Sequence, residues 1–139
     1  MVVSTGFQND WGKIKGAKEL LDDPKSNVCS IYDYNYAQKT GKVGKKFKGG
    51  KAIFTEPTLP IKCAGAPQKI LYLWTDLWKK SNLSVDVSYL KSAGVMFSVP
   101  KYSESLAKIA ARYHINVALK HNLVELTSNT ATFENVDTK

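Results

Sequence analysis

The sequence of 139 residues predicts an α/β fold, in which helices flank a parallel sheet and an antiparallel β-hairpin follows at the C-terminal end. The first observation is an alternation of strand-like and helix-like patterns, in the order β-α-β-α-β, from residue 51 to residue 119. The second is a pair of alternating stretches, 123–127 and 130–136, on either side of Ser128-Asn129. Strands that are connected through helices lie parallel. We therefore expect a Rossmann-like three-layer domain with a terminal hairpin.

The first part of the chain is expected to connect to this domain. The stretch Val2-Val3-Ser4-Thr5-Gly6 resembles the end of a strand that runs into a turn of small residues. A short helix is predicted over 17–21, and Asp22-Asp23-Pro24 ends it because the residue before a proline avoids helical backbone. A chain that begins inside a strand suggests a portion of a longer protein.

A longer helix is predicted over 34–47, where apolar residues recur at helical spacing. Gly41 and Gly44 each weaken this helix by about 1 kcal/mol relative to alanine. We divide the chain into two parts. Residues 1–48 form a segment with connecting helices, and residues 49–139 form the Rossmann-like domain.

Within the second part, the strand over 51–55 is followed by a helix in which Pro67 suits the first position. One face of this helix is predicted to be apolar through Ile70, Leu71, Trp74, Leu77 and Trp78. We interpret the two tryptophans as part of the core against a sheet.

The next strand is predicted over 83–89, and residues 90–97 are expected to form a loop, with a second short strand as an option. Pro100 opens another helix. Its predicted inner face consists of Tyr102, Leu106, Ile109, Ala110 and Tyr113. The last parallel strand is predicted over 115–119, with Ile115, Val117 and Leu119 facing one way.

Cys63 is expected just before the start of a helix, between the strand over 51–55 and the helix that Pro67 opens. Lys62 is its neighbour, and Lys69 follows one turn later. Free N–H groups at a helix start and nearby ammonium charges both favour a thiolate, which is the reactive form of cysteine. The alternative is a small buried residue in a tight turn, and the local sequence leaves both open.

The segment from Gly49 to Ile70 has the order Gly-Gly-Lys-Ala-Ile-Phe-Thr-x-Pro-x-x-Pro-Ile-Lys-Cys-Ala-Gly-Ala-Pro-Gln-Lys-Ile. This order resembles the mitochondrial type of sulfide:quinone oxidoreductase, a family of the flavin-dependent disulfide reductase superfamily. Weaker matches in the same order, such as Val99–Tyr102 and Lys120–Glu125, extend the resemblance over nearly the whole chain. The resemblance is to the central portion of the family.

The resemblance implies that Cys63 is the first of two redox cysteines. In the family, hydrogen sulfide attacks the sulfur bridge between them and leaves a persulfide, and FAD passes the electrons to ubiquinone. A small sulfur acceptor, glutathione or sulfite, then removes the persulfide sulfur. Thr5 and Gly6 are implied to lie close to FAD.

The same resemblance places the protein in mitochondria, in association with the inner membrane. It also implies that the second redox cysteine, most of the FAD site and the membrane-facing quinone region belong to the remaining portions of the flavoprotein. We therefore expect this chain alone to be inactive.

A dinucleotide-binding fingerprint is missing from the expected place. Where G-x-G-x-x-G would follow the first strand, the chain has Cys63-Ala64-Gly65-Ala66-Pro67. This argues against tight binding of NAD and agrees with a family that uses a quinone as acceptor. A nicotinamide-dependent disulfide reductase is disfavoured for this reason, and also because there is no CxxxxC pair.

The net charge of +8 has two interpretations, a lysine-rich solvated surface or a non-enzymatic basic binding module for anions, anionic lipids or partner subunits. Nucleic acid is not an expected partner, because no nucleic-acid-binding signature accompanies the lysines. The sequence has no run of about 20 apolar residues and no secretory signal pattern.

No metal site is expected. The only other cysteine, Cys29, forms no CxxC pair with Cys63 and is interpreted as structural. His114 and His121 lie seven residues apart, without a cysteine or carboxylate at ligand spacing. Both histidines are interpreted as surface or packing residues.

Overall fold

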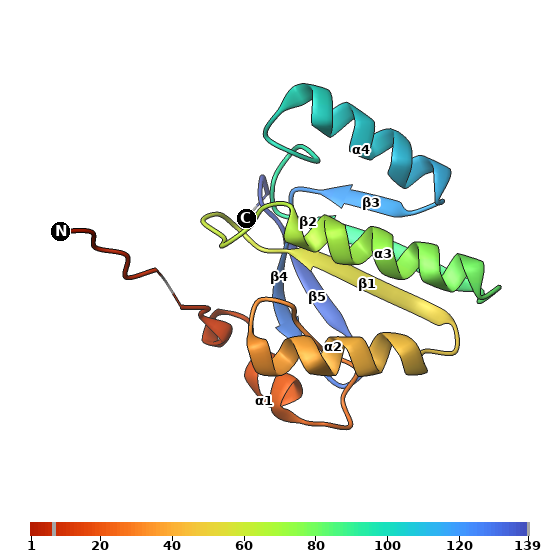
Figure 1. Ribbon diagram of the computed structural model, residues 1–139, viewed down its shortest axis with the longest axis horizontal. Coiled ribbons are helices and arrows are strands. Elements are labelled where there is room, and N and C mark those ends of the chain that lie inside the picture. The colour runs from red at the N-terminus through yellow and green to blue at the C-terminus, as the bar shows by residue number, and fades with distance from the viewer. Residues whose placement is uncertain (7, 139) are drawn as a thin grey trace.

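The computed structural model describes residues 1–6 and 8–138. A short 3-10 helix, η1 (Trp11–Lys13), precedes the regular elements. In chain order these are α1 (Ala17–Asp22), α2 (Tyr34–Lys46), β1 (Gly50–Glu56), α3 (Ala66–Lys80), β2 (Val85–Lys91), α4 (Pro100–Arg112), β3 (Asn116–Leu119), β4 (His121–Leu126) and β5 (Ala131–Asn135) (Figure 1). The predicted α/β fold with a C-terminal hairpin is confirmed.

Two sheets organise the chain. Strands β1, β2 and β3 form a parallel sheet in that order, and β4 pairs with β5 in an antiparallel hairpin. Because right-handed crossovers connect adjacent parallel strands, α3 and α4 lie on the same face of the parallel sheet. Strand β4 contacts β1 and β2.

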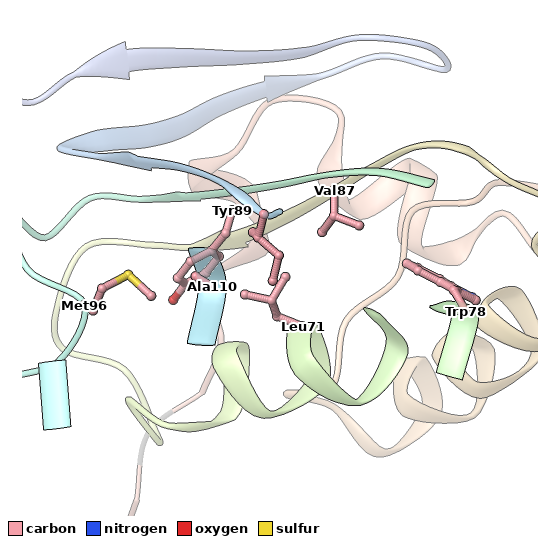
Figure 2. Packing of buried hydrophobic residues seen from close by; sticks show 7 residues of the cluster. Leu71, Trp78, Val87, Tyr89, Met96 and Ala110 are labelled. Carbon is pink, nitrogen blue, oxygen red and sulfur yellow. The ribbon is translucent and has the colours of Figure 1, made fainter. Parts of the chain in front are cut away.

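The core lies between the parallel sheet and its two crossover helices. Figure 2 shows Leu71 and Trp78 of α3 close to Val87 and Tyr89 of β2. The side chains of Leu71 and Tyr89 are fully buried. The interpretation of the tryptophan pair as core is supported, since the rings of Trp74 and Trp78 stack with their centroids 5.8 Å apart and Trp78 is buried.

Three predicted inner positions are more exposed than the sequence pattern indicates. Leu77 is 43% exposed, Tyr102 is 58% exposed and Val117 is 38% exposed. Tyr102 lies in the first turn of α4, whose buried residue, Ala110, lies near the other end of the helix. Val117 lies on β3, which has a parallel neighbour on one side only. The buried faces of α3, α4 and β3 therefore include fewer residues than helical or strand periodicity alone predicts.

The segment Val2–Gly6 is not a strand in this structure. It has no regular secondary structure, its side chains are exposed, and Figure 1 shows it extending away from the folded body. The prediction of a strand end was wrong because a strand needs a neighbour for its backbone hydrogen bonds, and within residues 1–6 and 8–138 no strand pairs with this segment. Strand β2 also differs, because it begins at Val85 and continues to Lys91, and the optional strand that follows is not formed.

Gly44 of α2 allows this helix to pack closely against α3. A Cβ atom at Gly44 would lie 2.3 Å from the Trp74 ring, and the Gly44 carbonyl accepts a hydrogen bond of 3.1 Å from Trp78 Nε1. The glycine that weakens the isolated helix is therefore required by tertiary packing.

Gly44→Ala is expected to lower the free energy of unfolding by about 1–3 kcal/mol, because its methyl group would overlap the Trp74 ring. Gly41→Ala is the matched control on the same helix, since a Cβ there would meet nothing within 4 Å. Higher helix propensity should make this control more stable by up to about 1 kcal/mol. Urea unfolding of both variants measures the difference, and equal effects would contradict the packing argument.

Candidate functional site

Cys63 lies in the loop between β1 and α3, at the carboxyl end of the parallel sheet. This is the edge at which open α/β sheets usually bind ligands. The cysteine side chain is exposed and not in a disulfide. The structure therefore does not bury Cys63 in the turn, and an accessible thiol is what a reactive cysteine requires.

The backbone around Cys63 forms the turn that starts α3. The carbonyl of Cys63 accepts a hydrogen bond of 3.2 Å from the Ala66 N–H. Gly65 is the N-cap of α3, so Ala66 takes the first helical position and Pro67 the second. The predicted placement just before a helix is confirmed, with Pro67 one position later than expected. Lys62 and Lys69 are both exposed near this turn.

A buried polar cluster lies directly behind the loop. Glu56 ends β1, Lys91 ends β2, and the two residues are register partners in the parallel sheet. Lys91 Nζ lies 3.0 Å from Glu56 Oε1, and both side chains are at most 4% exposed. The hydroxyl of Tyr89 donates a hydrogen bond of 2.7 Å to Glu56 Oε2. Burial, with this hydrogen bond as the next cause, raises the pKa of Tyr89 far above its ordinary value, so the hydroxyl stays a donor.

The same cluster reaches the start of α3. The carbonyl of Met96 accepts hydrogen bonds from Lys91 Nζ at 2.9 Å and from Gln68 Nε2 at 2.6 Å. Gln68 is buried in the first turn of α3, and its Oε1 has no partner among the described residues. Lys91 therefore contacts Glu56, which precedes the cysteine loop, and shares the Met96 carbonyl with Gln68, which follows the loop.

Cys29 has a different environment. It is partly buried, and burial raises the pKa of its thiol, while a hydrogen bond with Thr40 and the charge of Lys39 act in the opposite direction. A raised pKa means a smaller thiolate fraction at neutral pH, so Cys29 is expected to react more slowly than an ordinary thiol. This environment suits the structural role predicted for it.

The structure does not bring Thr5 and Gly6 to Cys63. Both residues lie in the exposed segment that extends away from the body (Figure 1). The start of α3 also does not suit a dinucleotide pyrophosphate, because Pro67 lacks one of the N–H groups that would face it. The contact of Thr5 and Gly6 with FAD therefore stays a prediction.

Neither histidine forms part of a cluster that could bind a metal. His114 is exposed, and His121 Nδ1 lies 2.7 Å from the Leu119 carbonyl oxygen. Among the described residues, no group of three or more histidine, cysteine, aspartate or glutamate side chains is arranged to hold a metal ion. In the same part of the chain, no helix has the length and apolar character needed to cross a bilayer.

Sequence reasoning missed the polar residues that surround the cysteine loop. The sequence does contain a signal for Glu56 and Lys91. Side chains alternate between the two faces of a strand, so Glu56 lies on the same face of β1 as Phe54, and Lys91 lies on the same face of β2 as Tyr89. An acidic and a basic residue on the inward faces of two adjacent strands, both at the carboxyl end, predict an ion pair once the strand register is known. Tyr32, whose hydroxyl also contacts the loop, carries no local signal of this kind.

Comparison with known proteins identifies relatives along nearly the full sequence. No family model matches the chain. It is 38% identical to a mitochondrial sulfide:quinone oxidoreductase of Schizosaccharomyces pombe over 99% of this chain, and 37% identical to that of Mus musculus over 99%. The corresponding protein of Dictyostelium discoideum is 43% identical over 96% of this chain. The chain spans only 30–31% of the length of these relatives.

Solved structures show the same fold at low sequence identity. The sulfide:quinone oxidoreductase of Aquifex aeolicus matches 91% of this chain with a TM-score of 0.69 and 15% identity, and the chain covers 30% of it. A chain of the Tetrahymena thermophila mitochondrial ATP synthase matches 97% with a TM-score of 0.70 and 18% identity, with 35% of that chain covered. A water-forming NADH oxidase of Lactobacillus brevis matches 91% with a TM-score of 0.58 and 14% identity, with 25% covered. The chain is thus similar over nearly its whole length to about a third of a mitochondrial sulfide:quinone oxidoreductase, which confirms the resemblance indicated by the segment around Cys63.

Proposed function

We propose that this chain is the cysteine-bearing portion of a FAD-dependent sulfide:quinone oxidoreductase, and that Cys63 is one of its two redox cysteines. The observation that carries the proposal is the exposed thiol of Cys63 at the carboxyl edge of the parallel sheet. It occurs in a chain that is 37–43% identical to proteins of that name. The proposed substrates are hydrogen sulfide and ubiquinone.

The proposed chemistry is thiol–disulfide exchange. Hydrosulfide attacks a disulfide between Cys63 and a second cysteine in another portion of the protein. A new sulfur–sulfur bond then forms on one cysteine as a persulfide, and the other cysteine leaves as a thiolate that keeps the electron pair of the broken bond. An exposed Cys63 allows both the partner cysteine and hydrosulfide to approach. Glutathione or sulfite is the proposed acceptor of the persulfide sulfur.

FAD is the proposed carrier of the electron pair to ubiquinone. Portions of the protein outside this chain would hold most of the FAD, and Thr5 and Gly6 are its predicted contacts within the chain. The proposed location is the mitochondrion, at the inner membrane. Because the chain spans only 30–31% of the length of its relatives, we expect the purified 139-residue chain to be colourless and inactive.

Peptide mapping of the full-length protein tests the role of Cys63. Under non-reducing conditions, we expect Cys63 to be linked through sulfur to a cysteine outside this chain, and hydrosulfide to open that link. Cys29 is the internal control and should stay a free thiol throughout, because it is partly buried. A Cys63 that remains a free thiol before and after hydrosulfide would sink the assignment.

A basic binding module is the second candidate, and the groove beside α2 favours it. Asp22 and Tyr36 line this groove together with four exposed lysines, namely Lys25, Lys42, Lys46 and Lys48. This candidate requires binding to anionic vesicles that weakens with salt. It also requires a Cys63 that reacts no faster than an ordinary thiol.

A further inference from the structure

We propose that Tyr32 is a positioning residue for Cys63, and that its hydroxyl fixes the turn that presents the thiol in front of α3. The hydroxyl of Tyr32 donates a hydrogen bond of 2.8 Å to the carbonyl oxygen of Cys63. An effect of this contact on catalysis rests on the proposed function, whereas the hydrogen bond is independent of that function.

The two ends of the cysteine loop are already fixed by the buried cluster. Glu56 is held at one end by Lys91 and Tyr89. Gln68 is held at the other end through the Met96 carbonyl, which Lys91 also contacts. Cys63 lies between these two anchors, seven residues after Glu56 and five before Gln68. Tyr32 supplies the anchor at this point, from a segment 31 residues earlier in the chain.

Tyr32 is itself held firmly enough to serve as an anchor. Its backbone N–H donates to Ser30 Oγ at 3.2 Å, and its carbonyl accepts from Asn9 Nδ2 at 2.9 Å. The next residue, Asp33, caps α2 by accepting a hydrogen bond of 2.9 Å from the Asn35 N–H. The backbone on both sides of the tyrosine is therefore fixed to structure outside the cysteine loop.

The hydroxyl of Tyr32 also keeps its proton. Burial raises the pKa of Tyr32 to about 12, and the charges of Glu56 and Cys63 act in the same direction. The hydroxyl therefore remains a donor to the Cys63 carbonyl over the whole neutral range. Since the same carbonyl accepts the Ala66 N–H at 3.2 Å, holding this oxygen fixes the turn between Cys63 and the first residue of α3.

Tyr32→Phe tests the proposal, because it removes the hydroxyl and keeps the ring. Tyr72→Phe is a matched control: the Tyr72 hydroxyl also donates to a backbone carbonyl, that of Leu106 at 2.9 Å, and burial raises its pKa to about 12 as well. Amide hydrogen exchange of residues 57–66 in the purified chain is the first measurement. We expect exchange roughly two- to ten-fold faster in Tyr32→Phe and unchanged in Tyr72→Phe.

Thiol reactivity is the second measurement. Loss of the hydrogen bond removes a constraint on the turn that carries the thiol, so the rate of alkylation of Cys63 by iodoacetamide should differ by at least about two-fold between Tyr32→Phe and the unmodified chain. The rate at Cys29 in the same sample is the internal reference. Exchange and alkylation equal to those of Tyr72→Phe would overturn the role of Tyr32.

The full-length protein separates this inference from the proposed function. If Tyr32 positions Cys63, Tyr32→Phe should lower kcat for sulfide-dependent quinone reduction and leave the KM for a soluble quinone unchanged. Lack of activity in the unmodified full-length protein would overturn the proposed function only, since exchange and alkylation still decide whether Tyr32 holds the loop. A rise in the KM for quinone with an unchanged kcat would contradict a positioning role.

Discussion

Lys91→Met is expected to lower the free energy of unfolding by about 3–5 kcal/mol, which is the largest effect on stability that we predict. The substitution removes the cation that lies 3.0 Å from Glu56 Oε1 and leaves the carboxylate at the buried end of β1 without its counter-charge. It also removes one donor to the Met96 carbonyl. A loss of this size is a large part of the roughly 5–15 kcal/mol that stabilises a typical domain.

The double variant Glu56→Gln with Lys91→Met is the matched control. It removes both charges together, and the introduced glutamine side chain keeps an oxygen that can accept from the Tyr89 hydroxyl. We expect it to recover most of the stability lost in Lys91→Met, because replacing a buried pair as a whole costs much less than removing one partner. Urea unfolding of the unmodified protein, Lys91→Met and the double variant gives the comparison. Adding Glu56→Gln completes a double-mutant cycle, which gives the interaction energy between the two side chains.

A result in which Lys91→Met and the double variant are equally unstable would contradict this account. It would mean that the contacts of the lysine with the Met96 carbonyl and its own packing matter more than the charge on Glu56. Tyr89→Phe provides an independent check, with an expected loss of about 1.5–3 kcal/mol for one hydrogen bond to a charged group.

The order of helices and strands was predictable because it depends on short-range periodicity. The alternation through Phe54 in β1 and Tyr89 in β2 defines an inward face in each strand, and the sequence predicts both strands and their parallel connection. The errors arise where burial depends on neighbours in space. Tyr102 continues the helical pattern of α4 and is nevertheless exposed, because the pattern does not specify how far along the helix the packing extends.

The environment of Cys63 was only partly predictable for the same reason. Its place before a helix follows from local residues, and the turn at Gly65 and Ala66 confirms it. The pairing of Glu56 with Lys91 requires the register of two strands, and the contact of Tyr32 requires the path of a segment 31 residues away. Neither is contained in the spacing of residues around the cysteine.

Cys63→Ser in the full-length protein is expected to lower sulfide-dependent reduction of a soluble quinone by about a thousand-fold or more. A serine hydroxyl cannot take part in a disulfide or a persulfide, so the exchange step has no route. The loss should appear in kcat, since an exposed serine in the same loop leaves the buried cluster behind it in place. The rate of quinone reduction after addition of hydrosulfide is the measurement.

Cys29→Ser is the control that makes this result specific. It removes the other thiol of the chain, at a partly buried position beside Thr40, and should leave the rate within about two-fold of the unmodified protein. Circular dichroism and thermal unfolding of both serine variants establish that each is folded before the rates are compared. If Cys63→Ser keeps its activity while folded, the redox role of Cys63 is wrong. If both variants lose activity equally, the loss reflects thiol removal in general and the exposed cysteine at the edge of the sheet has no special part in the reaction.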